Sequence, residues 1–238
     1  MALAFVAWQT GSSSGALDPL ILPAPAAVAA ALGTVLRSGT VWAALGLTLA
    51  ELALAFAFAA GSGLLIGFAI GRSPFAVRVF DPLLAGLYAV PTILLFPLYL
   101  LFFGIGPPSK IALGATMAFF PIVLSTIAGF AQVSRVHLAA AQSMGANAPQ
   151  LFRYVMFPDA FPIVIAGLRM GLVLGFLAVL GGETLTSNGG LGHEIVTMAE
   201  SLEPAKMFAY IVVAIAAASA LNLLTSYAEL RGRRHETA

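Results

Sequence analysis

Five long apolar runs with almost no charge constrain this chain more than any other feature. Each is at or above the roughly 20 residues that a helix needs to cross the hydrocarbon core of a bilayer, where helices satisfy their own backbone hydrogen bonds. Only 9% of the 238 residues are charged, against about 25% in a soluble domain. We therefore predict an all-α fold, a polytopic membrane helical bundle with five to six spans. The runs cover residues 43–71, 83–103, 111–131, 163–183 and 207–227.

The first run is longer than one straight crossing requires, and glycines recur toward its end. Gly63, Gly67 and Gly71 are spaced four residues apart, which places them on one helix face and permits close helix contact. Ordinary packing within the chain would use this face. We also expect it to favour association with a second copy of the chain.

The N-terminal segment, residues 1–40, differs from the rest. Residues 1–20 contain only a short apolar stretch, so we expect the end of a sixth span, or a span that this sequence lacks. A basic start and a cleavage site are both missing, which argues against a signal peptide. Pro23–Leu36 predicts a short interfacial helix begun by prolines. Residues 41–231 then form the transmembrane domain, and residues 232–238 a cytoplasmic tail.

Basic residues predict the orientation. Seven of the eleven Lys and Arg residues fall on one side of a five-span arrangement and three on the other. Because positive charge is enriched in cytoplasmic loops, the loop at 132–161 and the C-terminus are predicted to be cytoplasmic. The seven are Arg72, Arg78, Arg135, Arg153, Arg231, Arg233 and Arg234. The three on the opposite side are Arg37, Lys110 and Lys206.

The stretch "LAAAQSMGANAPQLFRYVMFP", residues 138–158, interrupts the apolar runs with small and polar residues. Gly145 is placed to end a first short helix. Asn147 and Gln150 have the spacing of a capping box that opens a second helix, and we expect Pro158 to close it. Two short helices joined by a glycine turn are expected. From the residues alone, this hairpin is either a rigid docking element or a plain connector.

The same stretch resembles the cytoplasmic loop of binding-protein-dependent ABC importer permeases. That family's pattern is Glu-Ala-Ala, three residues, Gly, nine residues, Ile, one residue, Leu-Pro. Ala140 and Ala141 match the alanines, and Gly145 follows after three residues. Val155 follows after nine more, and Pro158 closes the pattern.

Three positions depart from that pattern. Ala139 stands where the family favours Glu, while Val155 and Phe157 replace Ile and Leu and keep an apolar side chain. The wider sequence is similar to the nitrate/sulfonate/taurine type of permease. The similarity includes the proline-rich segment 80–110 and "GGETLTSNGGLGHEI" at 181–195.

This resemblance implies the type I ABC importer permease fold in the bacterial inner membrane, and a transport subunit rather than an enzyme. It implies a homodimer of two copies that form the pathway, a cytoplasmic ATPase dimer, and a soluble binding protein outside. We expect no cofactor in this chain, with ATP–Mg bound by the ATPase, because the sequence contains no Gly-x-x-x-x-Gly-Lys-[Ser/Thr] phosphate loop. The implied ATPase-coupling residues are Ala139, Ala140, Ala141, Gly145, Ala146, Asn147, Pro149, Arg153, Val155, Phe157 and Pro158.

Five residues within or beside the runs are candidates for the pathway: Glu51, Pro91, Pro97, Arg169 and Glu183. The prolines predict either a bent helix that lines the pathway or a structural kink. Intramembrane charges are functional candidates. Glu51 and Arg169 lie at different depths, so we do not expect them to pair. Arg169 can also reach the inner headgroups, and Glu183 can rest at the outer interface.

Other functions remain as alternatives. An ion-gradient-driven secondary transporter would usually have more spans and internal repeats, which are not evident here. An intramembrane enzyme would need a motif such as Gly-x-Ser-x-Gly or His-Glu-x-x-His. His193-Glu194 begins the latter but Thr197 replaces its second histidine, so no metal site is expected. The implied substrate is a small organic solute such as a sulfonate, taurine, nitrate or a vitamin precursor. The outer acidic residues disfavour a strongly anionic substrate.

Overall fold

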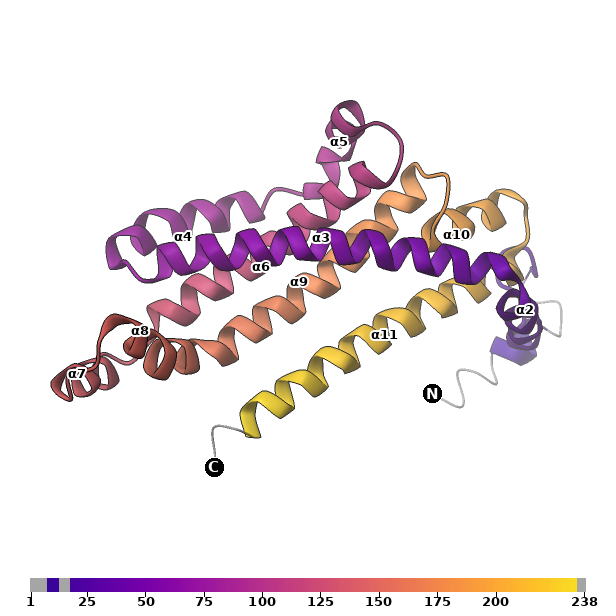
Figure 1. Cartoon of the computed structure of the whole chain (residues 1–238). Helices are drawn as coiled ribbons and strands as arrows, with labels where there is room; N and C mark the ends of the chain where they lie inside the picture. Colours follow the sequence, from indigo (N-terminus) through magenta and orange to yellow (C-terminus); the bar gives the residue numbers. More distant parts are fainter. Residues whose placement is uncertain (1–7, 13–17, 235–238) are drawn as a thin grey trace.

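The structure is a computed structural model that describes residues 8–12 and 18–234, with side chains up to residue 226. Within these ranges every regular element is helical, as predicted (Figure 1). Residues 8–12 are helical as well. The elements that follow are α2 (Pro25–Arg37), α3 (Gly39–Gly71), α4 (Pro74–Tyr88), the 3₁₀ helix η1 (Thr92–Leu95), α5 (Phe96–Phe103), α6 (Pro107–Ala131), α7 (Arg135–Ser143), α8 (Ala148–Leu151), the π-helix η2 (Phe152–Met156), α9 (Phe157–Leu185), α10 (Leu191–Glu200) and α11 (Pro204–Arg234).

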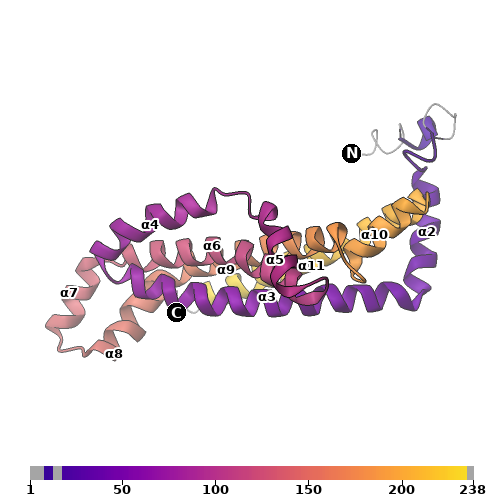
Figure 2. The same cartoon turned by 90° about the horizontal axis from the view of Figure 1, so that it is seen from above.

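Four of the five predicted spans are confirmed as single helices, and the count is five when the bent pair at the second run is taken as one span. Helices α3, α6, α9 and α11 are each long and apolar enough to cross a membrane. The second predicted run becomes α4 followed by η1 and α5, bent by 76° between Tyr88 and Thr92 (Figure 2). Pro91 stands at this break, where its missing N–H cannot continue the helix. The partial sixth span expected in residues 1–20 lies largely outside the described residues, as does most of the tail at 232–238.

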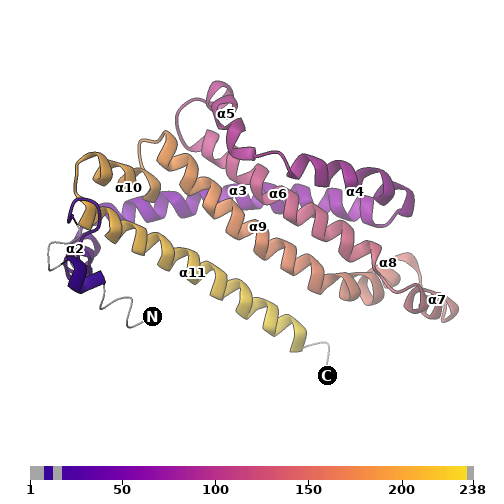
Figure 3. The same ribbon diagram turned by 180° about the vertical axis from the view of Figure 1, so that it is seen from behind.

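The bundle has two distinct ends (Figure 1). We call the end formed by α7 and α8 the loop end, and the end formed by α2 and α10 the opposite end. Helix α11 starts beside α10 and runs back toward the loop end (Figure 3). The loop at 132–161 and the end of α11 therefore lie toward the same end of the bundle.

Helix α6 is the centre of the bundle and packs against both α3 and α9. The stripe of Gly63, Gly67 and Gly71 faces α6 so closely that a Cβ at Gly67 would lie 2.5 Å from Thr126 Cβ. The packing within the chain that we expected is thus confirmed. The idea that this face serves a second copy is wrong, because α6 already fills it.

Helix α9 reaches α6 through a stripe of its own. A Cβ at Gly167 would lie 2.3 Å from Ser125, and one at Gly171 would lie 2.6 Å from Ile122. Small residues let helix backbones approach closely and gain dispersion contacts, which drive helix association in lipid. Helices α3, α6 and α9 therefore form one tightly joined core.

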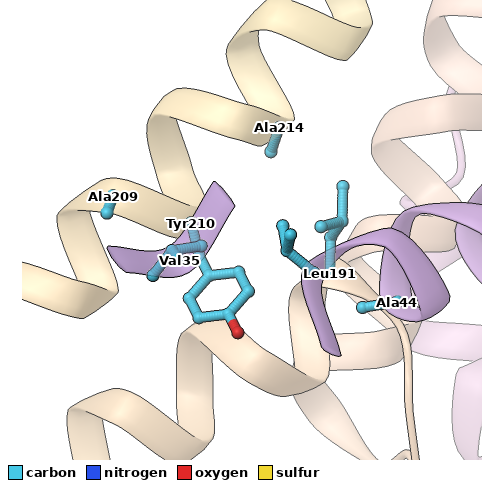
Figure 4. Packing of buried hydrophobic residues seen from close by; sticks show 7 residues of the cluster. Val35, Ala44, Leu191, Ala209, Tyr210 and Ala214 are labelled. Carbon is cyan, nitrogen blue, oxygen red and sulfur yellow. The ribbon is translucent and has the colours of Figure 1, made fainter. Parts of the chain in front are cut away.

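A buried apolar cluster closes the opposite end (Figure 4). Val35 of α2, Leu191 of α10 and Tyr210 of α11 meet there, and all three are buried. Tyr210 also shares a hydrogen bond of 3.3 Å between its hydroxyl and that of Thr40. Helix α2, which begins with a proline as predicted, is held to the bundle by these contacts.

Candidate functional site

The turn after α7 has the geometry of a Schellman motif. Gly145 N donates to Gln142 O at 2.9 Å, and Ala146 N donates to Ala141 O at 3.1 Å. Gly145 has a φ of 82°, in the left-handed region that glycine adopts without steric cost. The prediction that Gly145 ends the first short helix is confirmed.

The second short helix opens as predicted but does not close where we expected. Asn147 Oδ1 accepts from Gln150 N at 3.0 Å, and Gln150 Oε1 accepts from Asn147 N at 2.9 Å, which completes the capping box. The prediction that Pro158 ends this helix is wrong. Helicity continues from Ala148 to Leu185 through the π-helix, and Pro158 falls in the first turn of α9 directly after it.

The residues of the family pattern divide into two groups. Ala141 is buried, and Val155 packs in a cluster with Phe130, Val133 and Ala160. These two positions hold the hairpin to the bundle. The others at the hairpin surface are exposed or half-buried: Ala139, Ala140, Gly145, Ala146, Asn147, Pro149, Arg153, Phe157 and Pro158.

Aromatic rings join the hairpin to the ends of α3 and α6. Phe152, in the π-helix, lies 5.2 Å from Phe68 and 6.2 Å from Phe130, measured between ring centroids. Phe68 and Phe130 meet edge to face at 4.9 Å. Phe152 opens the π-helix and stays 38% exposed while its ring makes these contacts. These three rings therefore form the contact between the hairpin and the ends of α3 and α6.

One polar contact at the hairpin has no evident signal in the sequence. Asp159 Oδ2 lies 3.1 Å from His137 Nδ1 and accepts from Ser134 N at 3.3 Å. Ser134 is the N-cap of α7, and its Oγ accepts from His137 N at 3.4 Å. Asp159, in the first turn of α9, thus ties the start of α7 to the start of a membrane-spanning helix.

The tip of the hairpin presents apolar side chains outward. Val136 is 75% exposed, Met144 82% and Tyr154 69%. Arg153 lies beside Tyr154, with its guanidinium carbon 5.8 Å from the ring centroid. These exposed side chains make the hairpin surface partly apolar.

A second polar group lies at the other end of α3 and α6. Lys110 Nζ lies 2.8 Å from Glu51 Oε1, and both side chains are at least 98% buried. Lys110 also donates to Ser187 Oγ at 2.8 Å. Glu51 Oε1 is held by the charge of Lys110 rather than by an aligned hydrogen bond, and Oε2 accepts no hydrogen bond from any residue that the structure describes. Lys110, expected as a loop lysine, is therefore an interior residue.

Glu183 extends this group to α10. Its Oε1 accepts from Thr48 Oγ1 at 2.7 Å, and its Oε2 accepts from Gly192 N at 2.8 Å. Thr48 in turn accepts from Leu191 N at 2.9 Å. The expectation that Glu183 rests at the interface is wrong, because its side chain is buried by the Gly-Leu-Gly turn. A Cβ at Gly190 would lie 2.1 Å from Glu183 Oε1.

The bend of the second span lies close to this buried group. Pro97 falls in the first turn of α5, where it introduces no further break. Phe96 beside it is buried, and a Cβ on Gly182 would meet both Phe96 and Lys110 within 3.4 Å. The bend at Pro91 therefore brings α5 against α6 and α9.

Arg169 is not part of this group. Its Nε donates to Asn222 Oδ1 of α11 at 2.9 Å. It lies 14 residues before Glu183 on the same helix, about 21 Å along the axis. As expected, Arg169 does not pair with Glu51.

Comparison with known proteins bears on the whole chain. Residues 59–229 match the family model described as "Binding-protein-dependent transport system inner membrane component". The taurine transport system permease protein TauC of Escherichia coli is 32% identical over 228 residues, which cover 94% of this chain and 83% of TauC. The putative aliphatic sulfonates transport permease protein SsuC of Bacillus subtilis is 30% identical over 206 residues, which cover 87% of this chain and 75% of SsuC.

Among solved structures, an inward-facing MetNI methionine ABC transporter chain superposes with a TM-score of 0.67 at 18% identity. The match covers 78% of this chain and 93% of that chain. At this identity, the likeness concerns the fold.

Proposed function

The chain belongs to the family of binding-protein-dependent transport system inner membrane components, and on that premise we propose that it imports a small sulfonate. It is a multi-pass inner-membrane permease subunit of an ABC importer, and ATP hydrolysis belongs to a separate subunit. Beyond family membership, we propose where the ATPase docks, which end of the bundle faces the cytoplasm, that two copies of the chain pair, and which class of solute is imported.

The hairpin of α7 and α8 is the docking element for the ATPase. The observation that carries this is the rigid turn at Gly145, closed by the Schellman motif and followed at once by the capping box. A connector has no need of a fixed angle between two short helices. The exposed side chains of Val136, Met144 and Tyr154 supply the apolar contact area.

The loop end faces the cytoplasm. Four arginines surround it, and the last three lie at the end of α11, which runs toward the same end. Lys110 no longer counts against this orientation because it is buried in an ion pair. The count is then seven basic residues at the loop end against two at the opposite end, Arg37 and Lys206. This larger excess strengthens the positive-inside argument.

Two copies of the chain form the pathway, and the binding protein docks at the opposite, periplasmic end. The support is geometric: five spans offer too little surface both to enclose a solute and to separate it from lipid. ATP–Mg is bound by the ATPase dimer, and this chain holds no cofactor. The glycine stripe of α3 takes no part in the dimer, because α6 covers it.

A sulfonate is the favoured substrate class because both relatives described above are named for sulfonates, taurine among them. The sequence argument against an anionic substrate rested on outer acidic residues, and the structure weakens it. Glu51 is neutralised by Lys110, and Glu183 is covered by the turn at Gly190–Gly192. Neither carboxylate is presented to a passing solute.

The test is uptake in proteoliposomes that contain this permease with the ATPase and the binding protein of the same importer. We expect uptake of radiolabelled taurine or an alkanesulfonate that requires ATP and the binding protein and ceases when the ATPase loses its phosphate-loop lysine. Uptake that survives this loss and responds to an ionophore would establish the secondary transporter instead. Uptake of nitrate with exclusion of sulfonates would overturn the substrate class alone.

A further inference from the structure

A basic pocket lies at the loop end, beside the docking hairpin but apart from its exposed tip. It has a volume of about 340 Å³. Arg72 comes from the C-cap of α3, Arg78 from α4 and Arg135 from the first position of α7. Three separate elements thus bring a guanidinium group to one cavity.

Among the described residues, no carboxylate forms an ion pair with any of the three arginines. The guanidinium carbon of Arg72 lies 6.0 Å from the centroid of the Phe68 ring. Helices α4 and α7 begin at the pocket while α3 and α6 end there, so their dipoles largely cancel and the three guanidinium groups set the sign of the field. The pocket therefore favours a ligand with a negative charge.

The remaining lining of the pocket is apolar. Val77, Phe130, Val133, Leu138 and Met156 form most of it. A free inorganic anion gains nothing from such a lining, whereas a glycerol backbone and the first acyl carbons do. The pocket lies at the ends of α3 and α6, two helices long and apolar enough to cross a membrane, so in a bilayer it would sit near the headgroups. Guanidinium groups bind phosphate oxygens through paired hydrogen bonds.

We propose that this pocket binds the phosphate of an anionic phospholipid in the cytoplasmic leaflet. The headgroup rests among Arg72, Arg78 and Arg135, and the acyl chains leave along α6. Because Arg135 opens α7, the bound lipid joins the docking hairpin to the α3–α4 turn. The anionic lipid is thus a structural ligand of the coupling region, independent of the transported solute.

The experiment measures lipid binding to the purified full-length permease in nanodiscs. Phosphatidylglycerol is titrated into a phosphatidylcholine background, and the melting temperature and retained lipid are followed. We expect saturable stabilisation of the parent, with affinity lowered about 100-fold in the Arg72→Gln/Arg78→Gln/Arg135→Gln variant. The corresponding triple lysine variant keeps the charge and should retain most of the binding, which separates charge from folding.

The matched control removes three arginines that belong to other elements, the π-helix and the last turns of α11: Arg153→Gln/Arg231→Gln/Arg233→Gln. We expect it to bind phosphatidylglycerol like the parent. An equal loss in this control would overturn the proposal, because binding would then follow total surface charge. Equal stabilisation by inorganic phosphate would assign the pocket to a free anion. Loss of the lipid effect on adding the ATPase would assign it to an acidic segment of that partner.

Discussion

Lys110 Nζ and Glu51 Oε1 lie 2.8 Å apart and join α6 to α3 in the interior of the bundle. Their positions are 59 residues apart in sequence, and neither side chain has appreciable contact with solvent. A buried charge is costly without its partner, so the two residues depend on each other.

We predict that Lys110→Met destabilises the permease strongly, by about 3–5 kcal/mol, because it leaves Glu51 buried and uncompensated. The double variant Lys110→Met/Glu51→Leu should recover most of this loss. Lys206→Met provides the control, since its partner Glu203 is only half-buried and such pairs contribute about 0–1 kcal/mol. Thermal unfolding in detergent measures all three, and equal losses in the two single variants would contradict the prediction.

Gly145→Val should leave insertion intact and abolish association with the ATPase. A β-branched residue in the left-handed region is strained by about 1–2 kcal/mol, so the turn would open and the second helix would change direction. No neighbouring atom lies near the missing Cβ, so the effect arises from the backbone alone.

Two controls accompany this variant. Gly145→Asn should retain association, because asparagine tolerates the same backbone conformation, and His193→Ala in α10 should behave like the parent. The measurement is co-purification of the ATPase at matched membrane levels, with uptake assayed alongside. Normal binding and transport by Gly145→Val would mean that the hairpin is only a connector.

Gly67→Ala should destabilise the bundle by about 1–3 kcal/mol, because its Cβ would overlap Thr126 of α6. Gly61→Ala on the same helix meets nothing within 4 Å and should be neutral or slightly stabilising. Thermal unfolding of the two variants tests whether the stripe is used within the chain. If only cross-linking between copies changed, the stripe would belong to the dimer.

A cysteine at position 144 should be shielded from a membrane-impermeant thiol reagent in intact cells and should react after permeabilisation. The sequence contains no cysteine, so Met144→Cys and Ser201→Cys each carry a single thiol. Both positions are exposed, at opposite ends of the bundle. Ser201→Cys should react in intact cells. The reverse pattern would invert the topology.

Asp159→Ala should loosen the start of α7 without unfolding the spans. It removes the acceptor for both Ser134 N and His137 Nδ1. We expect hydrogen exchange in residues 134–146 to rise about tenfold, consistent with the loss of one or two charge-assisted hydrogen bonds. His137→Ala leaves the backbone hydrogen bond in place and should give a smaller rise. Unchanged exchange in both variants would show that this contact does not stabilise the start of α7.

The sequence was informative wherever the signal is local. Each span follows from about 20 consecutive apolar residues, and the hairpin turn follows from Gly145 and the three-residue spacing of Asn147 and Gln150. Pro158 was ambiguous because a proline can end one helix or occupy the first turn of another, and only the preceding π-helix decides between them.

The buried polar group was beyond sequence reasoning for a different reason. Thr48, Lys110 and Ser187 meet across three separate segments, and nothing in the sequence near Lys110 indicates a partner on α3. The glycine stripe was recognised, but a stripe indicates that a helix comes close without indicating which one. Those contacts depend on how the spans are arranged, which hydropathy does not encode.

The continuous helix from Ala148 to Leu185 connects the two ends of the permease. Its 38 residues span about 57 Å, from the docking hairpin to the turn that covers Glu183. Continuous helical hydrogen bonding carries a movement along the axis, and the π-helix at Phe152–Met156 with the prolines after it is where such a helix bends most easily. If the ATPase docks on the hairpin as proposed above and tilts it, this helix would carry the movement toward the opposite end of the bundle, and the π-helix and the prolines would set how much of it arrives.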